Sequence, residues 1–276
     1  MTIRMMGQAS AAMKALQHKL DTIGHNLANS NTHGYKARKV EFQSLLKQNI
    51  NNLSDPNNAR GRITPNGIRV GTGAKVGTTN SNLALGAMQV TGRNLDTMLL
   101  HENHFYQIRV QQDGVDEIRY TRNGAFYVTP LGNGQVELVT SDGYPVYGVN
   151  GPIRFNDHFD AIRINERGEV IVTYGTTDVV AGRLAIVEIV RPRLLEAVGD
   201  NAFRLPDLAA LGYNLDEIVR MAPGDVPLVK NQALETSNVS IQEEMTDMII
   251  TQRAYQLNAR AITTADQMQG LINQLR

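Results

Sequence analysis

Residues 241–262 read IQEEMTDMIITQRAYQLNARAI. A set of seven mostly apolar residues in this stretch is spaced alternately four and three residues apart. This spacing is typical of a helix that buries a narrow stripe against another helix. Ser240 comes directly before the stretch and Glu243 follows three residues later, which is the capping-box spacing of a helix start. The recurring residues are Ile241, Met245, Met248, Gln252, Tyr255, Ala259 and Ile262.

The N-terminal end of the chain carries the same spacing. Residues 3 to about 30 predict a first helix, whose stripe consists of Met6, Ala9, Met13, Leu16, Leu20, Ile23 and Leu27. A lone helix of this kind is marginal in water, so we expect it to be poorly ordered until it is packed. The two ends together predict long terminal helices that form a coiled-coil-like bundle.

The middle of the chain, from about 83 to 230, has a β pattern. Phe105–Val110 and Val170–Tyr174 are rich in β-branched and aromatic residues, and Leu131–Gly134 predicts a turn. Short strands with frequent turns favour a central antiparallel β-rich domain, so the predicted fold class is α+β. The predicted parts are a terminal-helix assembly domain at 1–50 and 231–276, an extended linker segment at 51–82 and a β-rich domain at 83–230.

Composition excludes several classes of site. The 276 residues include 27 basic and 27 acidic side chains, so net charge gives no indication of a nucleic-acid partner. The chain has no cysteine, which excludes disulfides, thiol nucleophiles and thiolate metal sites. No apolar run approaches the ~20 residues of a membrane helix, so we expect no membrane insertion. Gln8 and Lys14 interrupt the N-terminal stretch, which makes it a poor cleavable signal peptide, so export of the chain would need another route.

Enzymatic and nucleic-acid functions find little support. His101 and His104 flank Glu102, but a zinc-protease helix needs histidines four residues apart. Gly71–Gly73 lacks the third glycine of a dinucleotide loop. Tyr35–Lys39 is a single basic run in a neutral chain. We therefore expect no catalytic residues, no cofactor, no metal and no nucleic acid; a generic self-associating secreted surface protein remains an alternative.

Two long motifs resemble the signatures of bacterial flagellar rod and hook axial proteins. The first is Asn26-Leu-Ala-Asn-Ser-Asn-Thr-His-Gly-Tyr-Lys36, and the second includes Leu234-Glu-Thr-Ser-Asn-Val239 and Thr251–Asn258. The resemblance covers nearly the whole chain. The length and the segment Pro65–Gly73 most resemble the distal rod members, although proximal rod and hook-type members share the end motifs. The chain departs from the family at Gln232, where a glycine is usual.

The resemblance implies a structural subunit of the flagellar drive shaft, not an enzyme. Such subunits form a helical tubular polymer that transmits torque around the export channel, with the terminal helices inside and the β-rich domain outside. The implied partners are further copies of the chain and other flagellar rod, hook and bushing proteins. The implied location is the basal body, in the periplasm or the cell wall depending on the envelope. The expected assembly interface is Met6, Met13, Leu16, Leu20, Ile23, Asn26, Leu27, Asn29, Asn31, Met245, Met248, Gln252, Tyr255 and Ile262.

The polar members of this interface have two interpretations. Asn26, Asn29 and Asn31 can cap the helix and form a turn locally. They can also bond between subunits and fix the register, as a polar residue in a helical seam does. Gln252 has the same two interpretations, and the sequence leaves both open.

Overall fold

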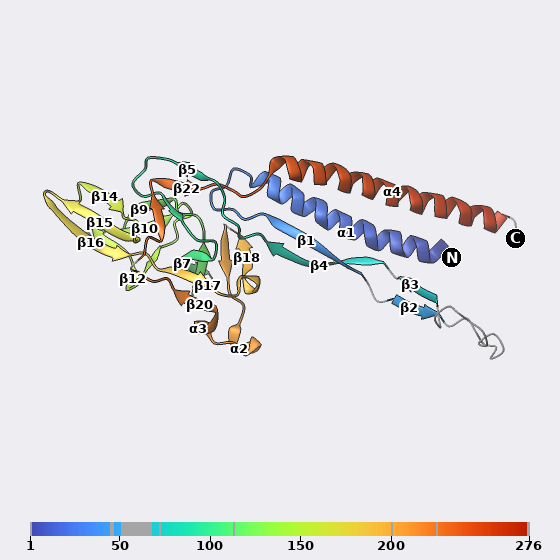
Figure 1. Ribbon diagram of the computed structural model, residues 1–276, viewed down its shortest axis with the longest axis horizontal. Coiled ribbons are helices and arrows are strands. Elements are labelled where there is room, and N and C mark those ends of the chain that lie inside the picture. Colours follow the sequence, from blue (N-terminus) through green and yellow to red (C-terminus); the bar gives the residue numbers. More distant parts are fainter. Residues whose placement is uncertain are drawn as a thin grey trace. The chain divides into compact units, whose positions relative to one another are not determined.

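The computed structural model describes residues 2–44, 47–50, 68–71, 73–112, 114–199, 201–224 and 226–274. The fold is α+β, with a helix at each end and a central antiparallel β-rich region, as predicted (Figure 1). Contacts within the chain divide it into two compact units. Unit 1 consists of Met1–Ala28, Arg38–Asn80 and Ser240–Arg276, and unit 2 consists of Asn29–Ala37 and Ser81–Val239.

Unit 1 contains the two long helices, α1 (Thr2–Ala28) and α4 (Ile241–Gln274), which lie side by side (Figure 1). The start of α4 agrees with the capping-box prediction, because the Glu243 N–H donates to Ser240 Oγ at 3.4 Å. Glu243 and Glu244 lie in the first turn, where their negative charges interact favourably with the positive end of the helix dipole. The spacing of the two stripes therefore correctly predicts one long helix at each end.

The described residues of unit 1 also form four strands. β1 (Arg38–Ser44) pairs with β4 (Ala74–Ser81), and β2 (Lys47–Ile50) pairs antiparallel with β3 (Ile68–Gly71). The extended segment predicted at 51–82 thus contains two strands in its described part, while 51–67 and 72 lie outside the described residues. The units also have other boundaries than the predicted domains, because Asn29–Ala37 and the residues up to Val239 belong to unit 2.

Unit 2 is built mainly from three antiparallel sheets. The largest has the order β18-β19-β8-β7-β17-β20. Its strands are β7 (His104–Gln112), β8 (Val115–Thr121), β17 (Ile186–Ile189), β18 (Glu196–Gly199), β19 (Ala202–Arg204) and β20 (Val219–Met221). Two three-stranded sheets follow the orders β13-β10-β9 and β14-β15-β16. Their strands are β9 (Phe126–Pro130), β10 (Gln135–Thr140), β13 (Arg154–Asn156), β14 (Ala161–Ile164), β15 (Glu169–Tyr174) and β16 (Thr177–Arg183).

Short elements complete unit 2. Its two-stranded pairs are β11 (Tyr147–Gly148) with β12 (Gly151–Pro152), β6 (Thr97–Leu99) with β21 (Val229–Asn231), and β5 (Met88–Val90) with β22 (Ala233–Glu235). Its short helices are α2 (Leu208–Leu211), α3 (Leu215–Ile218) and a 3₁₀ turn, η2 (Pro192–Leu194). The pairs β6–β21 and β5–β22 join the last two strands of unit 2 to residues 88–99, near the start of the β region.

The core of unit 2 lies on both faces of the largest sheet. Side chains alternate along a strand, so neighbouring residues of β7 enter different clusters. Tyr106 packs edge to face on Phe126 at 5.1 Å between ring centroids, in the larger cluster. Phe105 packs on Phe203 at 5.7 Å in the second cluster. This alternation fixes the register of β7, since a shift by one residue would exchange the two clusters.

The backbone at Gln232 has a conformation that favours glycine. This residue connects β21 to β22 with φ of 54°, which is a left-handed conformation that side chains disfavour. Its Nε2 donates a hydrogen bond to Asn94 Oδ1 at 2.9 Å. The chain therefore keeps the turn geometry at this position without the glycine.

Candidate functional site

The predicted stripe of α1 is half-buried within unit 1. Ile23 is fully buried, and the other five predicted apolar residues, Met6, Met13, Leu16, Leu20 and Leu27, are half-buried. On α4, Met248, Tyr255 and Ile262 are half-buried, whereas Met245 and Gln252 are exposed. The structure therefore brings most of the predicted stripe residues into partial burial, with two of the α4 residues turned to solvent.

The buried face of α4 differs from the predicted stripe by one residue at two positions: Glu244 replaces Met245, and Thr251 replaces Gln252. Buried and half-buried side chains recur there at Glu244, Met248, Thr251, Tyr255, Asn258, Ile262 and Ala265. Among the described residues of α4 only Thr251 and Ala265 are fully buried. Thr251 satisfies its hydroxyl by donating to the Asp247 carbonyl at 2.6 Å. Sequence reasoning missed both residues because it followed the large apolar side chains.

A second apolar stripe lies on the solvent side of α4. Ile250, Leu257 and Leu271 are 58%, 64% and 61% exposed, and they are separated by one and by two heptads. In a heptad whose seam contains Thr251 and Ala265, these positions point away from the seam. Large exposed apolar side chains that gather on one face indicate an interaction surface.

Asn26 joins three elements of unit 1. Its side chain is buried, and its Oδ1 accepts the Arg38 N–H of β1 at 2.9 Å. Its Nδ2 donates to the Arg38 carbonyl and to Glu244 Oε1 of α4, both at 2.8 Å. Burial raises the pKa of Glu244, and the Asn26 hydrogen bond opposes this shift. Asn26 therefore bonds across elements of its own chain, an arrangement that neither interpretation from the sequence describes.

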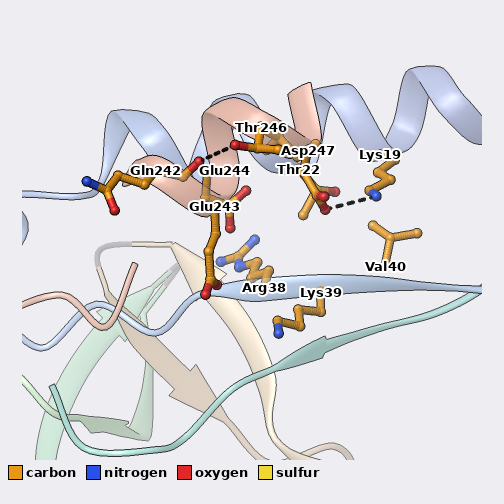
Figure 2. Close-up of a pocket in the computed structure, with 11 residues that line it drawn as sticks. Lys19, Thr22, Arg38, Lys39, Val40, Gln242, Glu243, Glu244, Thr246 and Asp247 are labelled. Atoms are coloured by element: carbon orange, nitrogen blue, oxygen red, sulfur yellow. Dashed lines mark hydrogen bonds and ion pairs between the residues drawn. The ribbon is translucent and has the colours of Figure 1, made fainter. Parts of the chain in front are cut away.

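A groove of about 530 Å³ lies beside this contact in unit 1 (Figure 2). Lys19 of α1 reaches Asp247 of α4 at 3.0 Å, and Arg38 and Lys39 come from β1. Both signs of charge line the groove, so it selects neither a free anion nor a free cation. A partly exposed pair such as Lys19–Asp247 contributes little stability, about 0–1 kcal/mol.

Asn29 and Asn31 lie in unit 2, after the end of α1. Thr32 donates its N–H to the Asn29 carbonyl and its hydroxyl to Asn29 Oδ1, both at 3.2 Å. Asn29 is half-buried and Asn31 is exposed. The contacts of Asn29 fit the local-turn interpretation.

Among the described residues of unit 2, the most buried charges form a cluster of Lys36, Arg122 and Glu235, which we call the ionic triad. Lys36 Nζ lies 2.6 Å from Glu235 Oε1. Arg122 donates through Nε and Nη2 to Glu235 Oε2 at 3.0 and 2.9 Å. The side chains of the two cations are 0% exposed and that of Glu235 is 1% exposed.

The remaining polar atoms of the ionic triad are also bonded. Gly86 donates its N–H to Glu235 Oε1 at 2.8 Å, and Lys36 donates to the Ala84 carbonyl at 2.7 Å. Arg122 Nη1 donates to three carbonyls, those of His101 and Glu102 in the loop before β7 and that of His104 at its first residue, at 2.7–2.8 Å. Each side-chain nitrogen and oxygen of the buried triad therefore has at least one hydrogen-bond partner.

The electrostatics of the triad follow from one carboxylate shared by two cations. Burial raises the pKa of Glu235, but Arg122 and Lys36 outweigh burial and hold that pKa below its usual value. Burial and the neighbouring Arg122 lower the pKa of Lys36 to about 8, against the opposing effect of Glu235. Removing one partner of a buried pair typically costs about 3–5 kcal/mol, because a buried charge is left uncompensated.

Backbone contacts join the two signature motifs around the triad. The Gly34 N–H donates to the Glu235 carbonyl at 2.8 Å, and Asn238 Oδ1 accepts the Ala37 N–H at 2.8 Å. Gly34 has φ of 69°, and a Cβ there would lie 2.7 Å from the carbonyl carbon of Arg122. Sequence reasoning missed this junction, although Lys36 and Glu235 each stand inside one of the motifs.

No feature of the described residues suggests catalysis or metal binding. The His101 and His104 rings pack edge to face at 4.6 Å. In the described part of the chain, no three His, Cys, Asp or Glu side chains gather so that they could hold a metal ion. None of the helices described is both long and apolar enough to cross a membrane.

Three parts of the sequence match known protein families. Residues 7–36 match the family described as "Flagella basal body rod protein". Residues 100–172 match "Flagellar hook protein FlgE/F/G D1 domain", and residues 230–275 match "Flagellar basal body rod FlgEFG protein C-terminal". The first and last matches contain Lys36 and Glu235, and the middle match contains Arg122.

Relatives match over nearly the full length. The flagellar hook-basal body complex protein FlhP of Bacillus subtilis is 38% identical over 99% of this chain and 100% of its own length. The flagellar basal-body rod protein FlgG of Borreliella burgdorferi is 35% identical, with 99% of both chains covered. FlgG of Agrobacterium fabrum is 33% identical, with 98% of both covered.

Proposed function

The chain belongs to the flagellar basal-body rod and hook protein family, and we propose that it works as a rod subunit that polymerises through its terminal helices. The family is structural and not enzymatic, and its members are components of the flagellar basal body that assemble with other rod and hook proteins. The proposal adds a helical tubular polymer of identical subunits, which surrounds the export channel and transmits torque.

The second apolar stripe of α4 is the observation that best supports polymerisation. Ile250, Leu257 and Leu271 stay exposed although α4 already packs on α1. Their heptad spacing suits a further helix, and the partner is α1 or α4 of another copy. Burying one such side chain contributes roughly 1.5–3 kcal/mol, so repeated contacts stabilise a stiff shaft. Contacts that do not close on themselves generate an open filament.

The predicted interface residues enter this proposal in two groups. Met245 and Gln252 are exposed and would contact a neighbouring copy. The half-buried stripe residues would lose their remaining exposure on assembly. The coiled-coil-like bundle is part of the same proposal, since its seams would run both within and between subunits.

The position along the axis and the location are proposed from the relatives. The similarity to FlgG, whose name is that of a basal-body rod protein, supports a position in the rod, and the resemblance of Pro65–Gly73 to distal rod members favours its distal part. The similarity to FlhP supports a second position, another axial protein of the hook-basal body complex. Either subunit would be exported without a cleavable signal peptide, contact rod, hook and bushing proteins, and lie in the periplasm or the cell wall.

Thiol protection tests the proposed interface, because the chain has no cysteine of its own. Leu257→Cys should react with a maleimide in the monomer and become protected when the protein polymerises. Ala265→Cys, in the buried seam, should be protected in both states. Val180→Cys, on β16 of unit 2, gives an exposed reference. A Leu257→Cys thiol that stays as reactive in the polymer as in the monomer would contradict the interface.

A further inference from the structure

The ionic triad gathers charges from widely separated parts of the chain. Glu235 lies 113 residues after Arg122 and 199 residues after Lys36. Among the described residues, no other carboxylate forms an ion pair with either cation. The carboxylate that pairs with both cations therefore comes from the last strand of unit 2, β22.

We propose that the ionic triad is a folding latch: the buried cations Lys36 and Arg122 keep the sheet around β7 and β8 open until β22 docks and supplies Glu235. A buried cation without its counter-ion strongly disfavours the closed state, whereas the paired cluster adds little net stability over an apolar one. The triad therefore makes closure of the sheet depend on the docking of β22. Unit 2 gains its core and its last strand in one cooperative step.

Arg122 connects the latch to the core. It directly follows β8, and its guanidinium lies over the Phe105 ring of β7 at 5.6 Å. The same group donates to two carbonyls of the loop that leads into β7 and to the carbonyl of the first residue of β7. An uncompensated charge at this position disturbs both the entry of β7 and the end of β8.

The docking of β22 also orders two other segments. Glu235 accepts the Gly86 N–H through its side chain and the Gly34 N–H through its carbonyl. The approach is close, because a Cβ on Gly86 would lie 1.9 Å from the Thr236 carbonyl oxygen. Docking of β22 thus fixes the segment at Gly34, the segment at Gly86 and the β7–β8 region in the same step. The latch concerns the folding of a single chain and does not depend on the assembly proposed above.

Hydrogen-exchange pulse labelling of the refolding full-length chain tests the order of events. The amides of β7 and β8 should gain protection at the same rate as those of Ala233–Glu235. Glu235→Gln keeps the shape of the side chain but leaves two uncompensated cations. It should increase the opening of these amides in the native state by about a hundredfold or more. Glu166→Gln, at the exposed pair with Lys230, is the matched control and should change neither rate nor opening.

A second variant tests the charge argument itself. Lys36→Met removes one of the two cations, so Lys36→Met in the Glu235→Gln chain should recover at least about tenfold of the lost protection. If Glu235→Gln alone does not fold, the double variant should still regain protected amides in β7 and β8. Failure of Lys36→Met to restore protection would overturn the latch, as would protection of β7 and β8 well before Ala233–Glu235.

Discussion

At the scale of single residues, the two signature motifs meet inside unit 2. Lys36 and Glu235 form an ion pair, and Gly34 lies against the backbone of Arg122 with a hydrogen bond to the Glu235 carbonyl. These residues hold together the segment that follows α1 and the segment that precedes α4. The sequence marks them only as parts of motifs, since no local pattern indicates that residues 199 positions apart become partners.

Gly34→Ala should destabilise unit 2 by about 3 kcal/mol or more. The left-handed backbone alone costs an alanine about 1–2 kcal/mol, and the contact with Arg122 adds to this cost. Gly92→Ala is the matched control, because Gly92 has φ of 71° with open space around it, and it should cost only about 1–2 kcal/mol. Urea unfolding measures both, and equal losses would argue against the close approach at Gly34.

The acid sensitivity of unit 2 should depend on Glu235. Its folded-state pKa lies below the ordinary value of 4.5, so its stabilising contribution is fully present above pH 4.5. The contribution is lost as pH falls through the folded-state pKa. Glu235→Gln should therefore lower stability at pH 7 by about 3–5 kcal/mol and flatten the fall below pH 4.5. Unfolding free energies from pH 7 to pH 3 test this, and an unchanged acid slope would contradict it.

At the scale of elements, the sequence predicted both long helices and the helix start at Ser240. It did so because the 3–4 spacing and the cap are local properties of the chain. It did not predict which residues of α4 are most buried. Thr251 and Ala265 are small and are the two fully buried residues among those described in α4, whereas a search for large apolar residues selects Met245 instead.

Ala265→Leu should destabilise the packing of α1 on α4 by about 1–3 kcal/mol, because the buried position has no room for three more carbons. Ala261 lies on the exposed side of the same helix, so Ala261→Leu should change stability by no more than about 0.5 kcal/mol. Thermal unfolding followed by circular dichroism compares the two. Equal effects would place the seam elsewhere.

Leu257→Gln should weaken polymerisation and leave the monomer intact. Removing one buried leucine from a contact between copies costs about 1.5–3 kcal/mol, so the critical concentration should rise about tenfold or more. Leu211→Gln removes an exposed leucine from α2 of unit 2 and serves as the control. Pelleting across a concentration series measures the change. An equal shift for both variants would point to general solubility and not to the stripe.

At the scale of the whole molecule, the sequence predicted the fold class and, through the resemblance, the family. The division into two units was harder to predict, because unit 2 takes Asn29–Ala37 from the N-terminal part and its last strand from the C-terminal part. Such a division depends on contacts between segments far apart in sequence. Composition and periodicity report only on neighbours along the chain.

The central claim is that the terminal helices drive self-assembly. Electron microscopy of the concentrated full-length protein, beside a chain of residues 29–239 that lacks α1 and α4, tests it most directly. The account predicts tubular polymers for the full chain and a soluble β-rich monomer for the shortened one. Polymers of the same form from residues 29–239, or a full-length protein that remains monomeric at every concentration, would contradict it.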